Sequence, residues 1–281
     1  MRAYAQRQYL PRVEPASTVP PTATPDPDDV LSGLLPNAGR RLALNTAAFA
    51  KPEGVGAVVR VQIDAGAFAG AAPTPLDVSV VAVDQTGKQI GSAKQTSTLS
   101  ATSAGTPGAG PVDIQTHIDL DPGDYEVRAA VADQQTGVAG SVFSQIAIPH
   151  FATDRLSVSD IAVEFGPARD GSAASPAPIV PTTRREFARG DQVRAFLQVY
   201  QGTQRTDAIV PVSVRVRILD AQGEATRDQS LVLSEKEFRA RRADCRINLP
   251  IDRLPTGEYL LEIGAAAGGE TTARKLRFAV R

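Results

Sequence analysis

Residues 120–127, with the sequence LDPGDYEV, return at residues 254–261 as LPTGEYLL, so that Tyr125 and Tyr259 lie 134 residues apart. Each stretch has the pattern of a turn followed by a strand. A tyrosine at this place is typical of the tyrosine corner of β-sandwiches, in which the hydroxyl bonds to backbone a few residues upstream. We therefore expect Tyr125 and Tyr259 to form two structural tyrosine corners, one in each copy of a repeated domain.

A second match supports the repeat, because the pair Val59-Arg60 recurs at the same spacing as Val193-Arg194. A length of 281 residues suits about two domains, each large enough to hold its own core. We predict a Pro-rich linker with a short helix at residues 1–38, one β-sandwich domain at 39–150 and a second at 151–281.

Apolar and polar side chains alternate from about residue 40 onward, as in the run from Val59 through Val61 to Ile63 and again at Val214 and Val216. Such alternation predicts strands with one buried and one solvated face, and therefore antiparallel sheets. About seven short strands in each copy, separated by turns, fit a two-layer sandwich. The predicted fold is all-β: two tandem immunoglobulin- or fibronectin III-like antiparallel β-sandwiches.

The N-terminal part has a different composition, with six prolines in residues 11–27. Such a segment predicts an extended linker. Asp26 followed by Pro27 then has the form of a helix start, with an N-cap and a proline at the first helical position. We predict one short helix over residues 27–35 whose apolar face is made by Val30, Leu31, Leu34 and Leu35.

The composition excludes several classes of function. Lys and Arg number 30 against 31 Asp and Glu, a net charge of −1, which gives no reason to expect nucleic acid or an anionic membrane as a partner. No stretch approaches the roughly 20 apolar residues of a membrane span. Residues 1–10 have no apolar region of the kind found in a signal peptide.

Residues that could carry chemistry are few and scattered. The two histidines, His117 and His150, lie on a predicted outer strand face and in the connection between the domains, and a zinc site needs three or four converging ligands. The single cysteine, Cys245, has the phase of a core residue. We expect no catalytic residue, no cofactor and no metal, and therefore a protein that is not an enzyme.

Two groups of residues are candidates for an interaction surface. Phe196 and Tyr200 fall out of phase with the core positions of their strand, so they form either an interface patch or a cover for a sheet edge. Arg239, Arg241 and Arg242 lie in the densest basic stretch of the chain. Protection of a strand edge and binding of an acidic partner are both open for these arginines.

Three stretches resemble the C-terminal region of large bacterial proteins that begin with a von Willebrand factor type A-like domain. They are PGDYEVR at 122–128 with the turn and strand that follow, IP at 148–149 with LSVSDI at 156–161, and TRREFARGD at 183–191. Residues 2–9, RAYAQRQY, are similar to the end of such an upstream domain. The resemblance implies an accessory pair of sandwiches beside a von Willebrand factor A-like domain, in an extracytoplasmic or cell-surface protein. The Asp-x-Ser-x-Ser motif of that family's metal site does not occur, so metal-dependent binding is not implied.

These observations favour a non-enzymatic structural or interaction module: a tandem β-sandwich scaffold that contacts a protein partner of unknown identity or presents a neighbouring domain. A glycan- or small-ligand-binding module is the alternative, and a hydrolase with its site at the domain junction is a third hypothesis. If the chain is complete as written, a cytoplasmic location is expected in place of an exported one.

Overall fold

The computed structural model describes residues 26–33, 35–68, 73–99, 113–166 and 179–281. Its one α-helix, α1, spans Pro27–Leu31, and short 3-10 helices lie at Gly66–Phe68, Glu235–Glu237 and Ile251–Arg253. The first seven strands are β1 (Ala43–Ala50), β2 (Ala57–Asp64), β3 (Thr74–Val83), β4 (Gln89–Leu99), β5 (Asp113–Leu120), β6 (Gly123–Asp133) and β7 (Ala139–Ile148). The other nine are β8 (Ser157–Val158), β9 (Ala162–Phe165), β10 (Glu186–Phe187), β11 (Val193–Tyr200), β12 (Val212–Leu219), β13 (Ala225–Leu233), β14 (Arg242–Leu249), β15 (Gly257–Ala267) and β16 (Glu270–Val280).

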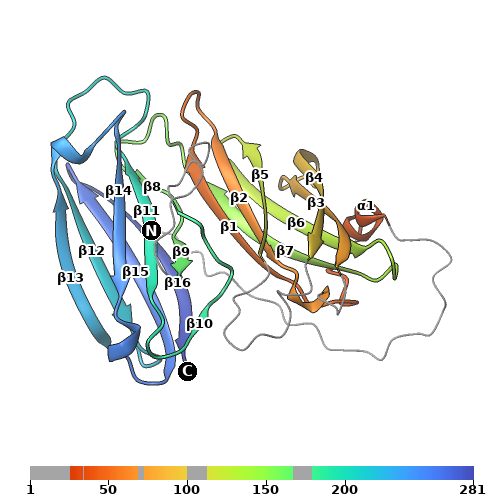
Figure 1. Cartoon of the computed structure of the whole chain (residues 1–281). Helices are drawn as coiled ribbons and strands as arrows, with labels where there is room; N and C mark the ends of the chain where they lie inside the picture. Colours follow the sequence, from red (N-terminus) through yellow and green to blue (C-terminus); the bar gives the residue numbers. More distant parts are fainter. Residues whose placement is uncertain (1–25, 34, 69–72, 100–112, 167–178) are drawn as a thin grey trace. The chain divides into compact units, whose positions relative to one another are not determined.

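The strands form four sheets, so the prediction of an all-β chain with antiparallel sheets and one short helix is confirmed (Figure 1). Two sheets have the orders β1-β2-β5 and β4-β3-β6-β7. The other two have the orders β10-β16-β15-β12-β13 and β14-β11-β8, and β9 also pairs with β11. The pairs β11–β14, β12–β13, β15–β16 and β3–β4 are antiparallel, and β10 pairs with β16 in parallel.

The described chain divides by its internal contacts into two compact units. Unit 1 extends to Thr46 and resumes over Arg60–Ile118 and Asp124–Ala147. Unit 2 takes Ala47–Val59, Asp119–Gly123 and Ile148–Arg281. A division of the chain at residues 150 and 151 stays a prediction.

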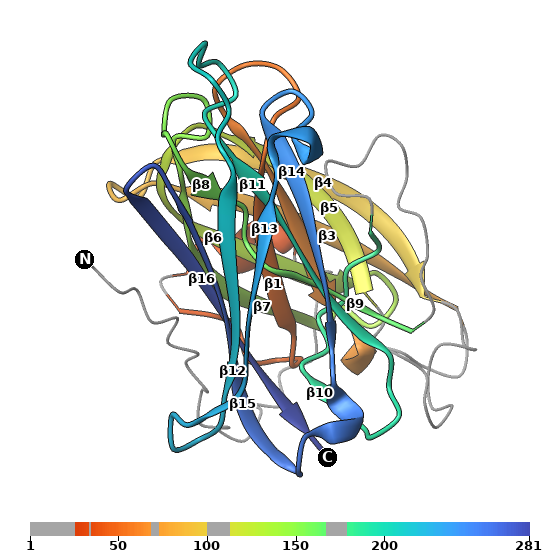
Figure 2. The same ribbon diagram turned by 90° about the vertical axis from the view of Figure 1, so that its left-hand side faces the viewer.

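The strands follow the same order of pairing twice along the chain. The order β4-β3-β6-β7 corresponds to β13-β12-β15-β16, and β1-β2-β5 corresponds to β8-β11-β14 (Figures 1 and 2). We call β1–β7 the first copy and β8–β16 the second copy.

The turns that join β3 to β4 and β12 to β13 are built alike. The Oδ1 atoms of Asp84 and Asp220 each accept hydrogen bonds from the backbone N–H groups two and four residues later. Gly87 and Gly223 follow with φ of 82° and 84°, a conformation that favours glycine. Because the same side-chain bonds set both turns, the strands on either side have corresponding registers.

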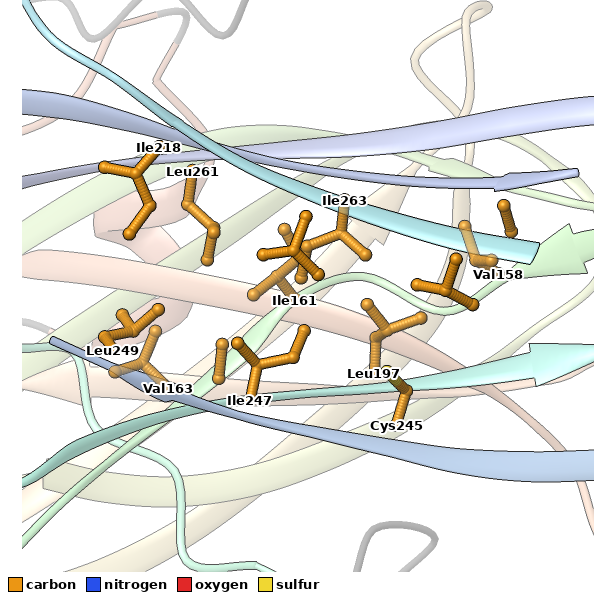
Figure 3. Close-up of a cluster of buried hydrophobic side chains, with 14 of the residues drawn as sticks. Val158, Ile161, Val163, Leu197, Ile218, Cys245, Ile247, Leu249, Leu261 and Ile263 are labelled. Carbon is orange, nitrogen blue, oxygen red and sulfur yellow. The ribbon is translucent and has the colours of Figure 1, made fainter. Parts of the chain in front are cut away.

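A buried apolar core fills the second copy. Inward side chains of β12 and β15 meet those of β11, β14 and β9, and Figure 3 shows Ile218, Leu261 and Ile263 facing Leu197 and Ile247. These five side chains are 0 to 3% exposed, which makes the fold sandwich-like. In the first copy, the buried strand residues of the same phase include Val59, Val61, Ile63, Leu76, Val78, Val80, Ile114, Ile118, Val127 and Val131.

The helix is shorter than predicted. Asp26 caps α1 as expected, with its Oδ1 accepting from the backbone N–H of Asp28 at 2.9 Å. The helix ends at Leu31, because the backbone N–H of Ser32 closes the last turn onto the carbonyls of Asp28 and Asp29. Leu35, predicted on the buried face, is 73% exposed, and Leu34 lies outside the described residues. The Pro-rich linker also falls outside them up to residue 25.

Candidate functional site

The two aromatic residues predicted as an exposed interaction surface are buried in unit 2. Phe196 and Tyr200, on β11, are 1% and 0% exposed. The ring of Phe196 lies 6.1 Å from that of Phe49, and the ring of Tyr200 lies 4.8 Å from that of Phe151. They are therefore interior residues of this unit, which corrects the alternative of a free interface patch.

The hydroxyl of Tyr200 joins a buried chain of hydrogen bonds. It accepts from the backbone N–H of Ala50 at 3.1 Å and donates to Gln198 Oε1 at 2.6 Å. The amide nitrogen of Gln198 in turn donates to Asp244 Oδ1 at 2.9 Å. Burial raises the pKa of Tyr200, so this hydroxyl keeps its proton. Because the buried Tyr200 hydroxyl and both polar atoms of the Gln198 amide have partners, the network is suited to fixing β11 in place.

Arg241 is tied to the loop that follows β11. Its Nε donates to the carbonyls of Gln201 and Gly202, at 2.6 and 2.8 Å. Its Nη1 and Nη2 donate to the carbonyl and the Oδ1 of Asp207, at 2.6 and 3.1 Å. The side chain is 14% exposed, so the guanidinium is used inside unit 2 and does not form part of an open basic patch.

The loop itself, residues 201–211, has further internal ties. The side-chain amide of Gln201 bonds to both backbone groups of Val210. Its Nε2 donates to the carbonyl at 2.6 Å, and its Oε1 accepts from the N–H at 3.0 Å. The guanidinium of Arg205 donates two hydrogen bonds, of 2.9 and 3.0 Å, to the carboxylate of Asp207. That guanidinium also holds the pKa of Asp207 below its usual value. The exposed side chains of Asp207 and Val210 are thus carried on a loop of defined shape, which we call the Arg241-held loop.

A strained turn presents Arg241 to this loop. Ala240 and Arg241 have φ of 47° and 62°, and the backbones of Arg239 and Arg242 bond to each other at 2.8 and 3.0 Å across them. This is the geometry of a type I′ turn, which glycine and asparagine favour. Alanine and arginine in this left-handed conformation each cost about 1 kcal/mol or more. The four hydrogen bonds of Arg241 offset that cost.

The other two predicted arginines have local roles. Arg239 donates to the carbonyl of Lys236 at 2.5 Å, within its own loop. Arg242 begins β14 and pairs with Tyr200 in the register of β11. The predicted basic cluster is therefore divided between a turn, a loop contact and a strand.

The tyrosine corner is present at one of its two predicted positions, and the other position is compatible with it. Tyr259 donates from its hydroxyl to the carbonyl of Pro255, four residues upstream, at 2.8 Å. Tyr125 occupies the corresponding place in the first copy and is 8% exposed. A corner at Tyr125 stays a prediction.

A shallow groove lies beside the start of α1 in unit 1, with a volume of about 520 Å³. Asp28 occupies its wall: Oδ1 accepts from Ser79 Oγ at 2.7 Å, and Oδ2 pairs with the ammonium of Lys94. These contacts, that of Lys94 first, lower the pKa of Asp28. The groove is lined by Asp26, Pro27, Asp28, Asp77, Val78, Ser79, Lys94, Gln95 and Thr96.

The other end of α1 is held by Arg128 on β6. Its Nη1 donates to the carbonyls of Leu31 and Gly33, at 3.2 and 3.3 Å. The guanidinium also lies 4.8 Å from the ring centroid of Phe143. A cation at the carbonyl end of a helix is favourable, so both ends of α1 are anchored to the sheet.

The residues considered for catalysis or metal binding do not converge. Cys245 is 2% exposed, and burial raises the pKa of its thiol to about 11. His117 and His150 are exposed. Within the described ranges, no group of three His, Cys, Asp or Glu side chains is placed to hold a metal ion. In the same part of the chain, no helix has the length and apolar character needed to cross a bilayer.

Sequence reasoning missed the partners that give these residues their roles. Gln201, Arg205 and Asp207 stand in a polar stretch with no alternation, and Arg128 has the phase of an ordinary outward strand residue. The one available signal was length: the segment between β11 and β12 is longer than a tight turn and ends at Pro211.

Comparisons with known proteins give only distant similarities. No family model matches the sequence, and no curated protein matches it. Among solved structures, dimeric latent PorU from Porphyromonas gingivalis is similar over 91% of this chain and 21% of its own, at 13% identity and a TM-score of 0.31. A β-glucuronidase from Bifidobacterium dentium, complexed with coumarin-3-O-glucuronide, is similar over 82% of this chain and 40% of its own, at 13% identity and a TM-score of 0.29. The chain thus spans well under half of either protein, and similarity at this level supports no inference about function.

Proposed function

We propose that this chain is a non-enzymatic interaction module, made of two tandem immunoglobulin- or fibronectin III-like sandwiches that present a protein-binding loop. The strand order supports the finer fold assignment. With the strands of each copy lettered in sequence order, β1-β2-β5 is A-B-E and β4-β3-β6-β7 is D-C-F-G. This is the order of an immunoglobulin constant domain with the fourth strand moved from the first sheet to the edge of the second.

The Arg241-held loop is the observation that carries the proposal. It connects β11 and β12, which correspond to strands B and C, and this is the position of a binding loop in immunoglobulin variable domains. Its shape is set by the Arg241 guanidinium and by the Gln201–Val210 and Arg205–Asp207 pairs. A loop that is already ordered loses little conformational entropy on binding, which favours affinity.

The strained turn at Ala240 and Arg241 also supports a functional role for this end of unit 2. Backbone strain at residues other than glycine persists where the surrounding structure over-determines it, and it clusters at functional sites. In this proposal the strain serves to place one guanidinium under the loop.

Together with the resemblance in the sequence, the proposal places the module beside a von Willebrand factor A-like domain in an extracytoplasmic or cell-surface protein. The sandwiches then act as spacer and as docking surface, and the partner is a protein.

Site-specific photo-crosslinking in the organism of origin tests this role. A photoreactive residue at Val210, which is 40% exposed on the loop, is expected to yield a discrete crosslinked protein. The same probe at Val232, 63% exposed on β13, is the matched control and is expected to yield none. Arg241→Met should reduce the Val210 crosslink because the loop loses its support. Equal crosslinking at both positions, or none at Val210, would contradict the proposal.

A small polar ligand is the second candidate function, and the groove beside α1 favours it. Three carboxylates, those of Asp26, Asp28 and Asp77, stand among its lining residues and suit a cationic or hydroxyl-bearing molecule. Titration of the labelled protein with a panel of sugars and amines, followed by NMR, is expected to shift the amides of Lys94 and Thr96 if this candidate is correct.

A further inference from the structure

The strand β4 ends its sheet, and among the described strands it pairs only with β3 (Figure 1). It runs for 11 residues, about twice the usual length of a strand. The edge of a sheet offers a row of backbone N–H and C=O groups to any other strand, and proteins protect such edges with short strands, prolines, bulges or charges.

The equivalent strand of the second copy, β13, is protected. Arg227 pairs with Ile218 in the register, so it lies on the core-facing side of the sheet at its very edge. It is half-buried, and its guanidinium donates to Gln229 Oε1 at 2.6 Å. A charge that points inward at an edge opposes the docking of another strand, which would bury it.

The first copy has no such pair in the same place. Gly91 pairs with Ala82 next to a bulge at Ile90 in β4, as Arg227 pairs with Ile218 next to a bulge at Thr226 in β13, so the bulge is common to both edges. The positions that correspond to Arg227 and Gln229 are therefore Gly91 and Ala93.

No other side chain of β4 brings a free charge to its edge, and the Gln95 amide donates to the carbonyl of Gln115 on β5 at 3.2 Å. The strand contains no proline, and its single charged residue is Lys94. The ammonium of Lys94 is paired with Asp28, which Ser79 on β3 also holds, so this charge is drawn over β3 and away from the edge. The exposed side chain of Ile90, 42% exposed, adds an apolar contact on the same strand.

We propose that two copies of this chain associate through β4, with the strands antiparallel, so that the four-stranded sheet continues from one copy into the other. A second copy is the occupant that fits, because an antiparallel strand pairs with itself about a two-fold axis and the contact closes at two chains.

The charges of the chain are compatible with this pairing. The register centred on Lys94 would place the two lysines opposite each other. A register shifted by one step in either direction places Lys94 opposite Ser92 or Thr96 of the second copy, and then no like charges meet. The net charge of −1 gives two chains little long-range repulsion. This inference concerns unit 1 and is independent of the Arg241-held loop.

Sedimentation equilibrium of the full chain tests the dimer. Edge pairing is a small interface, so the dimer is expected to form over a range of about 10 µM to about 1 mM. Over that range the average mass should rise toward twice that of the monomer and no further. In parallel, hydrogen exchange at residues 89–99 should slow as the concentration increases, while exchange in β13 stays the same.

Arg227 and Gln229, the pair that protects the edge of β13, supply matched variants. Gly91→Arg with Ala93→Gln copies it into β4 and should weaken dimerisation at least about tenfold without loss of folding, as judged by circular dichroism and a thermal melt. Arg227→Gly with Gln229→Ala removes it from β13 and should allow association beyond the dimer. A wild-type chain that stays monomeric, or a dimer that persists in the folded Gly91→Arg, Ala93→Gln variant, would overturn the proposal. If that variant fails to fold, the concentration dependence of exchange in wild-type β4 against β13 decides.

Discussion

The outer faces of the two corresponding sheets, β4-β3-β6-β7 and β13-β12-β15-β16, differ in what covers them. In unit 1, Val81 and Ala130 are buried beneath Leu31 of α1. The corresponding positions in unit 2 hold Arg217 and Gly264, and no helix of the described chain packs there. The same strand order therefore supports an apolar outer face in one unit and a polar one in the other.

A row of alternating charges crosses the outer face in unit 2. Asp228, Arg217, Glu262 and Lys275 are successive partners on β13, β12, β15 and β16. Arg217 lies 3.4 Å and Lys275 lies 2.8 Å from carboxylate oxygens of Glu262. The contacts with Lys275 and Arg217 lower the pKa of Glu262, and the contact with Lys275 is the stronger of the two.

The comparison shows which positions the fold depends on. Inward positions of the strands inside each sheet are apolar in both copies, because a sandwich needs its interior filled, and polar inward residues such as Arg227 and Gln229 lie on an edge strand. Outward positions are free to differ, and they decide what each sheet meets. In unit 1 the outward side chains pack against α1. In unit 2 they form a row of ion pairs that faces the solvent.

The largest difference between the two faces should appear when the same side chain is placed on each. Ala130→Gln puts an amide under α1 at a fully buried position and should lower the free energy of unfolding by about 2 kcal/mol. Gly264→Gln is the matched control, since a Cβ there meets only one backbone oxygen at 3.8 Å, and it should change stability by no more than about 0.5 kcal/mol. Urea unfolding measures both, and similar losses would show that the two faces are not different.

The tyrosine corners provide the next test. Tyr259→Phe removes the hydrogen bond to Pro255 and should cost about 1 kcal/mol in urea unfolding. Tyr125→Phe asks whether the first copy contains the same feature, and a similar cost is expected. A Tyr125→Phe protein as stable as wild type would limit the corner to the second copy.

The anchoring of α1 should depend on pH. The pKa of Asp28 is lowered in the folded protein, so its contribution is present above the ordinary value of 3.8 and is lost as the pH falls through the lowered value. Asp28→Asn should therefore reduce stability at pH 7, by about 0.5 kcal/mol for a pair this exposed, and should have no effect near pH 2. Thermal melts of both proteins at the two pH values make the comparison. A deficit that persists in acid would assign the effect to packing.

The smallest effect is expected from the charge row in unit 2. Glu262→Gln removes two partly exposed ion pairs and should cost about 0.5 kcal/mol or less at low salt. In about 1 M salt the difference from wild type should vanish, because screening weakens exposed pairs. A cost that is independent of salt would mean that Glu262 acts through something other than charge.

Local patterns were enough to predict those strands in which apolar and polar side chains alternate, and they did not indicate β1, β4 or β13. The alternation at Val59, Val61 and Ile63 and the tyrosine at position 259 depend on neighbours a few residues away, and the structure buries all four side chains. The length of α1 was predicted less well, because its end depends on a hydrogen bond of Ser32 and on Arg128, which lies far along the chain.

The candidate site was largely beyond sequence reasoning. Phe196 and Tyr200 were noticed because they are out of phase, yet their burial comes from Phe49 and Phe151, on other elements. Arg241 was noticed for its charge, and its role comes from Asp207 and from a positive φ that no local pattern indicates.

The sequence by itself determined that the chain is all-β and repeats one pattern, because alternation and turn residues act over a few positions. The tertiary structure decided which outer faces are covered, which carbonyl and carboxylate groups each guanidinium binds, and which sheet edge is protected. Those features depend on contacts between residues far apart in the sequence, such as Arg128 with Leu31, and only the folded chain brings such residues together.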